Sequence, residues 1–167
     1  MTVSLFFGKE EVQMPKAQYG ILRFAKYKGP EISNIEAHNE RKKEKYASNP
    51  DIDNNRRNLN YHFIEPVGKY RAESNRLIEE YGCRTRKDSV RVVEVLITAT
   101  PEFFKGKKKS EIRAYFQTAL EFIEKYQDSE TILSAVVHMD EKTPHMHLSF
   151  VPITQDGRLC AKEILGN

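Results

Sequence analysis

The spacing of apolar residues along the chain predicts an alternation of strands and helices. Short runs rich in β-branched and aromatic residues, several with alternating polarity, are typical of strands. Longer segments with apolar residues three or four positions apart are typical of helices that pack on a sheet. The predicted strands cover residues 19–26, 59–64, 89–98, 131–137 and 146–152, and the predicted helices cover 34–47, 69–81, 110–127 and 161–165.

Two of these segments indicate how the elements pack. Residues 89–98 are apolar at most positions, so this strand is expected in the interior of the sheet. The helix at 110–127 carries one broad apolar stripe that must lie on the sheet, formed by Ile112, Tyr115, Phe116, Ala119, Leu120, Ile123 and Tyr126. Pro101 is expected at the first position of a short helical turn. The predicted fold is α+β: a mostly antiparallel central sheet of about five strands, with helices mainly on one face.

The first predicted helix has an unusual polar pattern. Ser33 and Glu36 have the spacing of a capping box, which predicts a helix from about residue 34 to residue 47. On such a helix His38, Arg41, Lys42 and Lys45 share one face. A basic face is suited to covering something anionic, although a solvent-exposed helix would show the same pattern.

Three histidines lie within ten residues near the end of the chain. His145 and His147 are two apart, so on a strand both imidazoles leave the same face of the sheet. His138 closes the preceding strand, and an antiparallel return through residues 140–144 would bring it beside that pair. Three neutral imidazoles suit Zn, Mn, Fe, Ni or Cu and leave coordination positions open for a substrate oxygen. Scattered surface histidines are the alternative, but the His-x-His pair lies in an apolar strand, which favours a metal site and metal-assisted chemistry.

Composition sets the class of protein. The chain has 167 residues and 19.4 kDa, which is one domain of ordinary size, and 31% charged residues. No segment approaches the roughly 20 apolar residues that span a bilayer, and the first residues lack the pattern of a signal peptide. Cys83 and Cys160 are expected to be free thiols in a reducing cytoplasm.

The distribution of charge is more informative than its sum. The net charge is only +3, but Lys and Arg gather in four clusters around residues 41–45, 56–57, 84–87 and 105–109. Taken singly, each cluster of basic residues is explained by ordinary exposure of charged side chains to solvent. Their recurrence, interleaved with Tyr46, Tyr61, Asn58 and Asn60, favours nucleic acid as the partner.

Three motifs together resemble a known family. The triplet His145-Met146-His147 is similar to the HUH motif of single-strand endonucleases. Two further motifs precede this triplet and His138: His38-Asn39-Glu40-Arg41 and the Asn- and Arg-rich segment 51–61. In this order, the motifs resemble those of the MobV-type plasmid mobilisation relaxases, also called the Mob/Pre plasmid recombination family. The resemblance covers residues 19–167, leaving 1–18 as an N-terminal extension to which no structure is assigned. The abrupt end predicts the N-terminal part of a longer protein, with an oligomerisation region beyond this chain.

The resemblance implies a function and a mechanism. Such relaxases nick plasmid DNA at the origin of transfer for conjugative mobilisation, keep the 5′-phosphate covalently attached, and leave a free 3′-hydroxyl. It implies that His138, His145 and His147 hold a divalent metal, Mn²⁺ or Mg²⁺, and that His38 is the nucleophile. It implies an HUH relaxase-like fold that binds single-stranded or supercoiled plasmid DNA in a bacterial cytoplasm.

The remaining roles are assigned as follows. Glu141 is expected to hold the second ring N–H of His38, and Arg41 to pair with the phosphate. Glu141 as a turn residue or metal ligand remains an alternative. Tyr46 and Tyr61 are alternative nucleophiles, because a tyrosyl-phosphate is the commoner adduct among HUH enzymes. His62 is interpreted as structural. Candidate DNA contacts are Lys42, Lys45, Arg56, Arg57, Asn60 and Tyr61.

Two other function classes remain open. A hydrolytic metalloenzyme acting on a small phosphoester would use the same histidines but form no covalent adduct. A DNA-binding transfer accessory protein without catalysis would carry structural histidines. Nicking of plasmid DNA that is lost on metal chelation would exclude this second class.

Overall fold

A computed structural model describes residues 16–43 and 49–166, which form one five-stranded antiparallel sheet with helices. The strand order is β1-β3-β5-β4-β2, so β5 lies at the centre and β1 and β2 are the edges. The strands are β1 (Gly20–Tyr27), β2 (Tyr61–Ile64), β3 (Val92–Ala99), β4 (Ile132–His138) and β5 (His145–Phe150). The helices are α1 (Glu31–Asn39), α2 (Tyr70–Glu80), α3 (Pro101–Phe104), α4 (Lys109–Glu124) and α5 (Ala161–Leu165), with 3₁₀ turns at Asn54–Leu59 and Ser129–Thr131. The predicted α+β fold with an antiparallel five-stranded sheet is confirmed.

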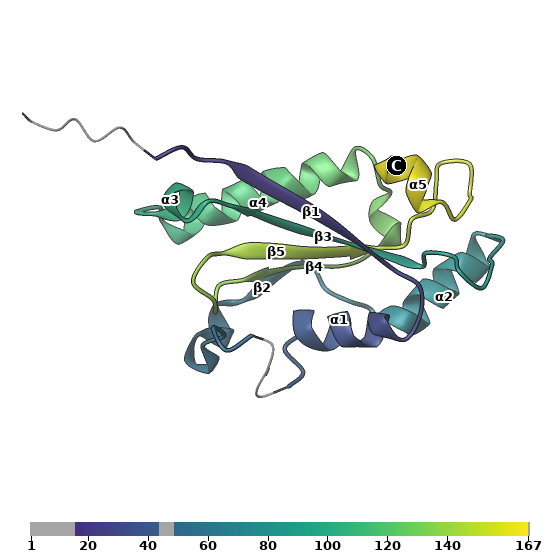
Figure 1. Cartoon of the computed structure of the whole chain (residues 1–167), viewed down its shortest axis with the longest axis horizontal. Helices are drawn as coiled ribbons and strands as arrows, with labels where there is room; N and C mark the ends of the chain where they lie inside the picture. The colour runs from purple at the N-terminus through teal and green to yellow at the C-terminus, as the bar shows by residue number, and fades with distance from the viewer. Residues whose placement is uncertain (1–15, 44–48, 167) are drawn as a thin grey trace, which may run out of the picture.

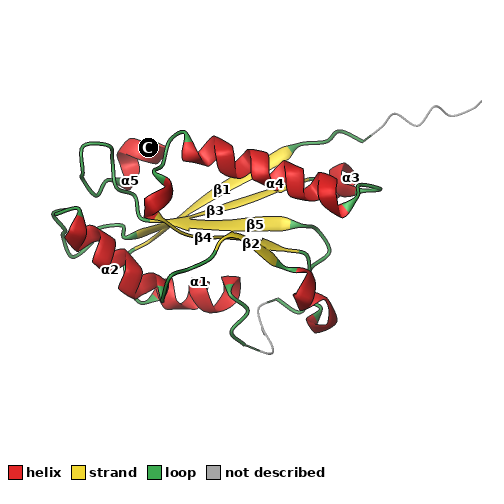
Figure 2. Cartoon of the chain, turned by 180° about the vertical axis from the view of Figure 1, so that it is seen from behind, coloured by secondary structure: helices red, strands yellow, loops and turns green. Residues whose placement is uncertain are grey.

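The helices cover both faces of the sheet. α3, α4 and α5 lie on one side and α1 and α2 on the other, as Figures 1 and 2 show from opposite directions. Each face therefore has its own core: Phe116 of α4 packs with Val95 and Leu148, whereas Ile32 of α1 packs with Leu77 of α2. The longest helix, α4, lies on the sheet as predicted. Because α1 and α2 cover the other face, however, the helices are shared between the two faces rather than lying mainly on one. The histidine face is covered by two helices.

The first helix is shorter than predicted and starts earlier. It begins directly after Pro30, so Ser33 lies inside it and the predicted capping box is wrong. It ends at Asn39 because the chain turns back in a Schellman motif: Lys42 N–H donates to Ala37 O at 2.9 Å and Arg41 N–H to His38 O at 3.3 Å. Arg41 occupies the left-handed position of this motif, with φ 49°.

This early end removes the predicted basic helix face. Arg41 and Lys42 follow the helix and do not share a stripe with His38. Lys45 and Tyr46 lie outside the described residues. The local pattern favoured a longer helix, but a turn fixed by contacts with distant residues ends it.

A bulge interrupts the alternation of side chains along β4. Simple alternation would place Ile132, Ser134, Val136 and His138 on one face, but the register shifts between Ile132 and Ser134. Ile132 therefore joins the core under α4, together with Phe150. The inserted residue reverses which face later side chains occupy, an effect that polarity alone does not reveal.

Two simpler expectations concern the whole described chain. Cys83 and Cys160 are free, as predicted. Among the helices of residues 16–43 and 49–166, none has the length and apolar character that crossing a bilayer requires.

Candidate active site

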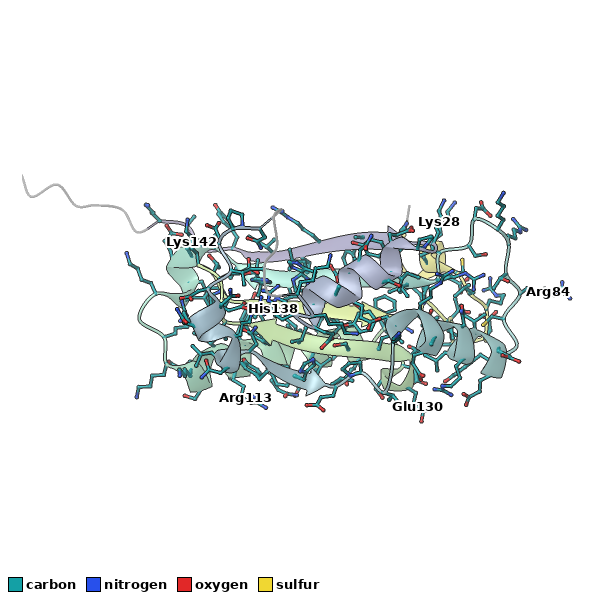
Figure 3. All side chains as sticks on the ribbon, turned by 90° about the horizontal axis from the view of Figure 1, so that it is seen from below. Lys28, Arg84, Arg113, Glu130, His138 and Lys142 are labelled. Carbon is teal, nitrogen blue, oxygen red and sulfur yellow. The ribbon has the colours of Figure 1, made fainter. Side chains whose placement is uncertain are left out.

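The three histidines of the β4–β5 hairpin meet at one end of the sheet. His138 is directly opposite His145, and Val136 is opposite His147, so all three imidazoles leave the same face. The ring centroids are 4.9 Å apart for His138 and His147, 5.1 Å for His145 and His147, and 5.2 Å for His138 and His145. Figure 3 shows His138 at the end of the sheet that also carries Lys142, with Arg84 at the opposite end. The strand-borne cluster predicted from the spacing is confirmed.

The ring nitrogens have divided roles. His138 Nε2 donates to the Asn39 carbonyl at 2.7 Å, and His145 Nδ1 donates to the Thr143 carbonyl at 2.9 Å. His147 Nδ1 lies 3.2 Å from Glu94 Oε1. Within the described residues, His138 Nδ1 and both ring nitrogens of His147 are buried and have no hydrogen-bond partner, so the contact of His147 Nδ1 with Glu94 is one of charge. Buried ring nitrogens without a partner fit a metal cation, because His138 and His145 each donate from one ring nitrogen and present a lone pair on the other.

The candidate ligand atoms fall into two overlapping sets. His38, His138 and His147 form one set and His138, Glu141 and His145 the other, and within each set the ligand atoms lie within 4.8 Å of one another. His138 belongs to both. Glu141 as a metal ligand, an alternative from the sequence, is therefore compatible with the geometry. The assignment of His138, His145 and His147 as the three ligands stays a prediction.

His38 reaches the cluster from the end of α1. Its ring centroid is 5.4 Å from that of His147 and 6.0 Å from that of His138. Arg41 Nη1 lies 3.4 Å from His38 Nε2, and since a guanidinium only donates, Nε2 carries the lone pair there. Burial, followed by the neighbouring His147 and Arg41, lowers the pKa of His38 to about 4. The ring is therefore neutral at pH 7.

A cavity of about 480 Å³ opens onto these residues. His38, His145, His147 and Glu141 line one part of it. Its other walls come from β1 and β3, through Ile21, Leu96 and Thr98, and from two loops, the one before the first 3₁₀ turn and the one between β4 and β5, through Asn49, Asp51 and Lys142. The cavity gives a substrate direct access to both His38 and the three-histidine cluster.

Arg41 and Glu141 occupy positions that differ from their predicted roles. The Arg41 fork donates to Asp140, through Nε to Oδ2 at 2.9 Å and Nη2 to Oδ1 at 2.8 Å, and Nη2 also donates to Glu141 Oε1 at 2.7 Å. Glu141 also accepts from Asn49 at 3.0 Å and lies 3.4 Å from His145 Nε2. Burial acts to raise the pKa of Glu141, but His145, Asn49 and Arg41 outweigh it and lower the pKa. Both side chains are thus engaged with protein groups, and their roles toward the phosphate and toward the His38 N–H stay predictions.

Glu94 is a site residue that the sequence reasoning missed. It lies on β3, opposite Ser149, on the same face as His147. Besides its contact with His147, its Oε2 accepts from Asn39 Nδ2 at 2.6 Å. Burial acts to raise the pKa of Glu94, but His147 and Asn39 outweigh it, so the pKa is lowered. The available signal was a single carboxylate within the apolar strand 92–99, because such a residue is rarely buried without a partner.

The predicted DNA contacts have mixed placements. Arg56 is exposed, and Lys42 is half exposed and paired with Glu36. Arg57 donates to the Lys43 carbonyl at 2.7 Å. Asn60 Oδ1 accepts from the Met139 N–H at 2.7 Å, so this side chain anchors the strand that carries His138. Of the candidates described, Arg56 and Lys42 keep the accessibility that a phosphate contact needs.

Tyr61 lies on the face of the sheet away from the histidines. It is opposite Val137, which belongs to the core under α4, and its hydroxyl is buried. Its ring contacts Phe63 and the Arg113 guanidinium, which is 4.8 Å from the ring centroid. This placement disfavours Tyr61 as a nucleophile or a stacking platform for DNA beside the histidines, and its predicted role stays a prediction. Neighbouring His62 does face the histidine side, where its Nε2 is 2.6 Å from Glu40 Oε2, as expected for a structural histidine.

Comparison with known proteins identifies similar sequences. Residues 16–167 match the sequence profile of a family described as plasmid recombination enzyme, Mob_Pre. The chain is 41% identical over 154 residues to a plasmid recombination enzyme type 1 of Staphylococcus aureus, covering 89% of this chain and 38% of that protein. It is 35% identical over 150 residues to a plasmid recombination enzyme of Bacillus thuringiensis, covering 88% of this chain and 33% of that protein. The chain thus spans well under half the length of these relatives.

Solved structures show the same fold. One similar structure is the MobM relaxase domain (MOBV; Mob_Pre) bound to plasmid pMV158 oriT DNA, a Mn-bound crystal structure at pH 6.8. It has a TM-score of 0.81 and 31% sequence identity, over 88% of this chain and 76% of that chain. Another structure of that domain, bound to a 26-nucleotide oriT DNA, has a TM-score of 0.67 and 26% identity, over 88% of this chain and 76% of that chain.

Proposed function

Because the chain belongs to the plasmid recombination enzyme family, we propose that it is the catalytic domain of a relaxase that nicks plasmid DNA at the origin of transfer. The reaction is a metal-dependent transesterification on one DNA strand. Its product is a covalent adduct between the 5′-phosphate and His38, which serves conjugative mobilisation. The similarity to a relaxase domain solved with oriT DNA and Mn supports this proposal.

The observation that carries the proposal is the position of His38. This residue is 100 or more positions away from His138, His145 and His147 in the sequence, yet its ring is 5.4 Å from that of His147 and lines the same cavity. A structural histidine of α1 would have no reason to lie against two further imidazoles, those of His138 and His147. A nucleophile must stand beside the groups that hold the scissile phosphate.

The chemistry of the chain's residues is consistent with attack on phosphorus. A ring-nitrogen lone pair of neutral His38 forms a P–N bond, and the P–O3′ bond breaks. The 3′ oxygen leaves with the bonding electrons and takes a proton from water to give the 3′-hydroxyl. The ring becomes cationic and releases its remaining N–H proton to water, which balances the proton taken up. Because the phosphoryl group stays on the protein, its bond energy is kept for later rejoining of the strand.

The residues that would hold the metal are His138, His145 and His147, through His138 Nδ1 and the Nε2 atoms of the other two. When bound there, a Mn²⁺ or Mg²⁺ ion supplies positive charge that offsets the charge developing on the scissile phosphate. The protein contributes the orientation of the rings. The Asn39 and Thr143 carbonyls accept from one ring nitrogen of His138 and of His145, and the Glu94 carboxylate lies 3.2 Å from His147 Nδ1, so the other ring nitrogen of each would be the one to bind the ion.

Arg41 acts as a positioning residue for His38. Its Nη1 donates to the His38 carbonyl at 3.1 Å while the rest of its fork is held by Asp140. The guanidinium therefore ties the end of α1 to the loop after β4. This role replaces direct pairing with the phosphate as the function that its contacts support.

The surface along which the DNA strand would lie, here called the DNA track, is proposed to follow the open side of the cavity and to include Arg23 and Arg56. Arg23 on β1 is exposed and is opposite Leu96, which is itself opposite His147, so Arg23 lies on the histidine face. Arg56 is exposed on the 3₁₀ turn before β2. Phosphate contacts from such residues give affinity without sequence readout, and they weaken with salt. Single-stranded or supercoiled plasmid DNA at the transfer origin is the proposed partner.

The test is capture of the adduct on an oligonucleotide that contains the transfer origin of the parent plasmid. Wild-type protein with Mn²⁺ should give a covalent protein–DNA product whose modified peptide contains His38 by mass spectrometry. A phosphoramidate is labile in mild acid, whereas a tyrosyl phosphodiester is stable, so acid treatment reports the linkage separately. His38→Ala should abolish the adduct, and Tyr61→Phe should retain it.

The alternatives predict different products. A tyrosine nucleophile would give an acid-stable adduct that survives His38→Ala. Hydrolysis of a small phosphoester without an adduct would support the metalloenzyme alternative. Binding of DNA without cleavage in Mn²⁺ or Mg²⁺ would support an accessory protein. Each of these results would overturn the proposal.

A further inference from the structure

Asn39 and Glu94 form a buried connection between the nucleophile helix and the metal-site strands. Asn39 is the last residue of α1 and is 1% exposed. Its carbonyl accepts from His138 on β4, and its side-chain amide donates to Glu94 on β3. Glu94 in turn lies against His147 on β5. Two residues thus link one helix to three strands.

We infer that Asn39 and Glu94 are positioning residues that set the metal-facing nitrogens of His138 and His147 and couple them to His38. The inference deepens the proposed function and rests on it. A carbonyl next to His138 Nε2 requires a proton on that nitrogen and leaves Nδ1 as the lone pair. The Glu94 carboxylate lies 3.2 Å from His147 Nδ1 without completing a hydrogen bond, and its negative charge favours the proton on Nδ1 and leaves Nε2 as the lone pair.

The same link fixes the nucleophile. His38 immediately precedes Asn39, so any shift of Asn39 moves the His38 backbone. Asn39 is held at two points, by its carbonyl and by its amide, and both partners belong to strands of the metal face. The connection through Asn39 and Glu94 therefore determines the orientation of the His138 and His147 rings and also their distance from His38. Misplacement of a nucleophile by about 1 Å lowers a reaction rate by about 100-fold.

Glu94→Gln tests the tautomer part of this inference. The Gln carbonyl can still accept from Asn39, which leaves its NH₂ group facing His147 Nδ1. His147 must then accept at Nδ1 and carry its proton on Nε2, the nitrogen that should bind the ion. We expect the Kd for Mn²⁺, measured by isothermal titration calorimetry without DNA, to rise by about 10- to 100-fold.

Ser149→Ala is the matched control. Ser149 is buried on the same face, directly opposite Glu94, and its hydroxyl has no hydrogen-bond partner within the described residues. This variant should leave the Mn²⁺ affinity unchanged. Thermal unfolding of both metal-free variants reports whether either change merely loosens the sheet. A Glu94→Gln protein that binds Mn²⁺ as tightly as wild type would overturn the inference.

A measurement on the wild-type protein does not depend on any variant folding. Nitrogen-15 NMR of the metal-free imidazoles distinguishes the two neutral tautomers. His147 should be protonated at Nδ1 and His138 at Nε2. The opposite tautomer at His147 in the wild type would overturn the inference.

Asn39→Ala separates ligand orientation from nucleophile position. The backbone carbonyl that holds His138 remains, but the contact with Glu94 is lost. At saturating Mn²⁺ we expect adduct formation to slow by about 10- to 100-fold, with a much smaller change in Mn²⁺ affinity than in Glu94→Gln. Unchanged adduct formation would overturn the coupling. If wild-type protein forms no adduct at all, the proposed function fails, and the Mn²⁺ affinities and tautomers still decide the role of Glu94.

Discussion

Arg41 and Asp140 are joined by two hydrogen bonds, Nε to Oδ2 at 2.9 Å and Nη2 to Oδ1 at 2.8 Å, although 99 residues separate them in the sequence. The side chain of Asp140 is fully buried and that of Arg41 is 7% exposed. The pair closes the turn after α1 and fixes the loop between β4 and β5. It therefore connects the two segments that carry the nucleophile and the metal-site histidines.

Removing one partner of this pair should be strongly destabilising. Asp140→Ala leaves the buried guanidinium with only part of its compensation, and we expect the free energy of unfolding to fall by about 3–5 kcal/mol. Urea denaturation of the wild type and the variant measures this difference in unfolding free energy. Asp51→Ala is the control, because the contact of Asp51 with Lys142 is 3.6 Å long and exposed. A fall for Asp140→Ala no larger than that control's would contradict a stabilising buried pair.

The backbone at Arg41 gives a second prediction about the same turn. Arg41 has φ 49°, which glycine adopts without steric strain. Arg41→Gly and Arg41→Ala both remove the ion pair, but glycine should be the more stable variant by about 1 kcal/mol. Thermal unfolding of the two variants side by side tests this order. An alanine variant equal to or better than glycine would show that the turn has rearranged.

The buried hydroxyl of Tyr61 has no hydrogen-bond partner within the described residues. Tyr61→Phe removes that unpaired polar atom and keeps the ring contacts with Phe63 and Arg113. We expect the stability to stay the same or to rise by about 1 kcal/mol, with adduct formation retained. A loss of more than about 1 kcal/mol in chemical denaturation would contradict an unpaired hydroxyl.

His62 should give the protein a pH-dependent stability. The hydrogen bond to Glu40 outweighs burial and raises the pKa of His62. A raised pKa in the folded state means that the contribution is fully present below the unfolded pKa of about 6.5 and is lost as pH rises through the folded value. The unfolding free energy of the wild type should therefore fall above pH 6.5 relative to His62→Gln. Parallel pH profiles for the two proteins between pH 6 and 9 would contradict this assignment.

Salt dependence tests whether Arg23 contacts DNA. The chain offers a matched control in Arg76, an arginine on α2 that is paired with Glu73 and Glu80. Arg23→Ala should weaken binding of a single-stranded oligonucleotide and reduce the slope of log affinity against log salt by about 0.7. Arg76→Ala should leave the slope unchanged. Equal slopes for wild type and Arg23→Ala would exclude Arg23 from the DNA track.

Much of the fold was readable in the sequence because it is set by local patterns. Alternating and continuous apolar runs predicted the five strands, and the apolar stripe of residues 110–127 predicted the helix α4 that covers one face. The His-x-His spacing of His145 and His147 predicted that both rings leave one face, since strand geometry alone dictates this. His138 followed from the short return between β4 and β5.

The tertiary structure decided what depends on distant contacts. The end of α1 is set by Arg41, which adopts a left-handed conformation that its contacts with Asp140 and Glu141 hold in place. The face occupied by Tyr61 depends on how β2 pairs with β4, and the place of Glu94 depends on the neighbours of β3. A sequence records periodicity within an element, whereas register between strands and the partners of buried charges arise only when elements far apart in the chain are packed together.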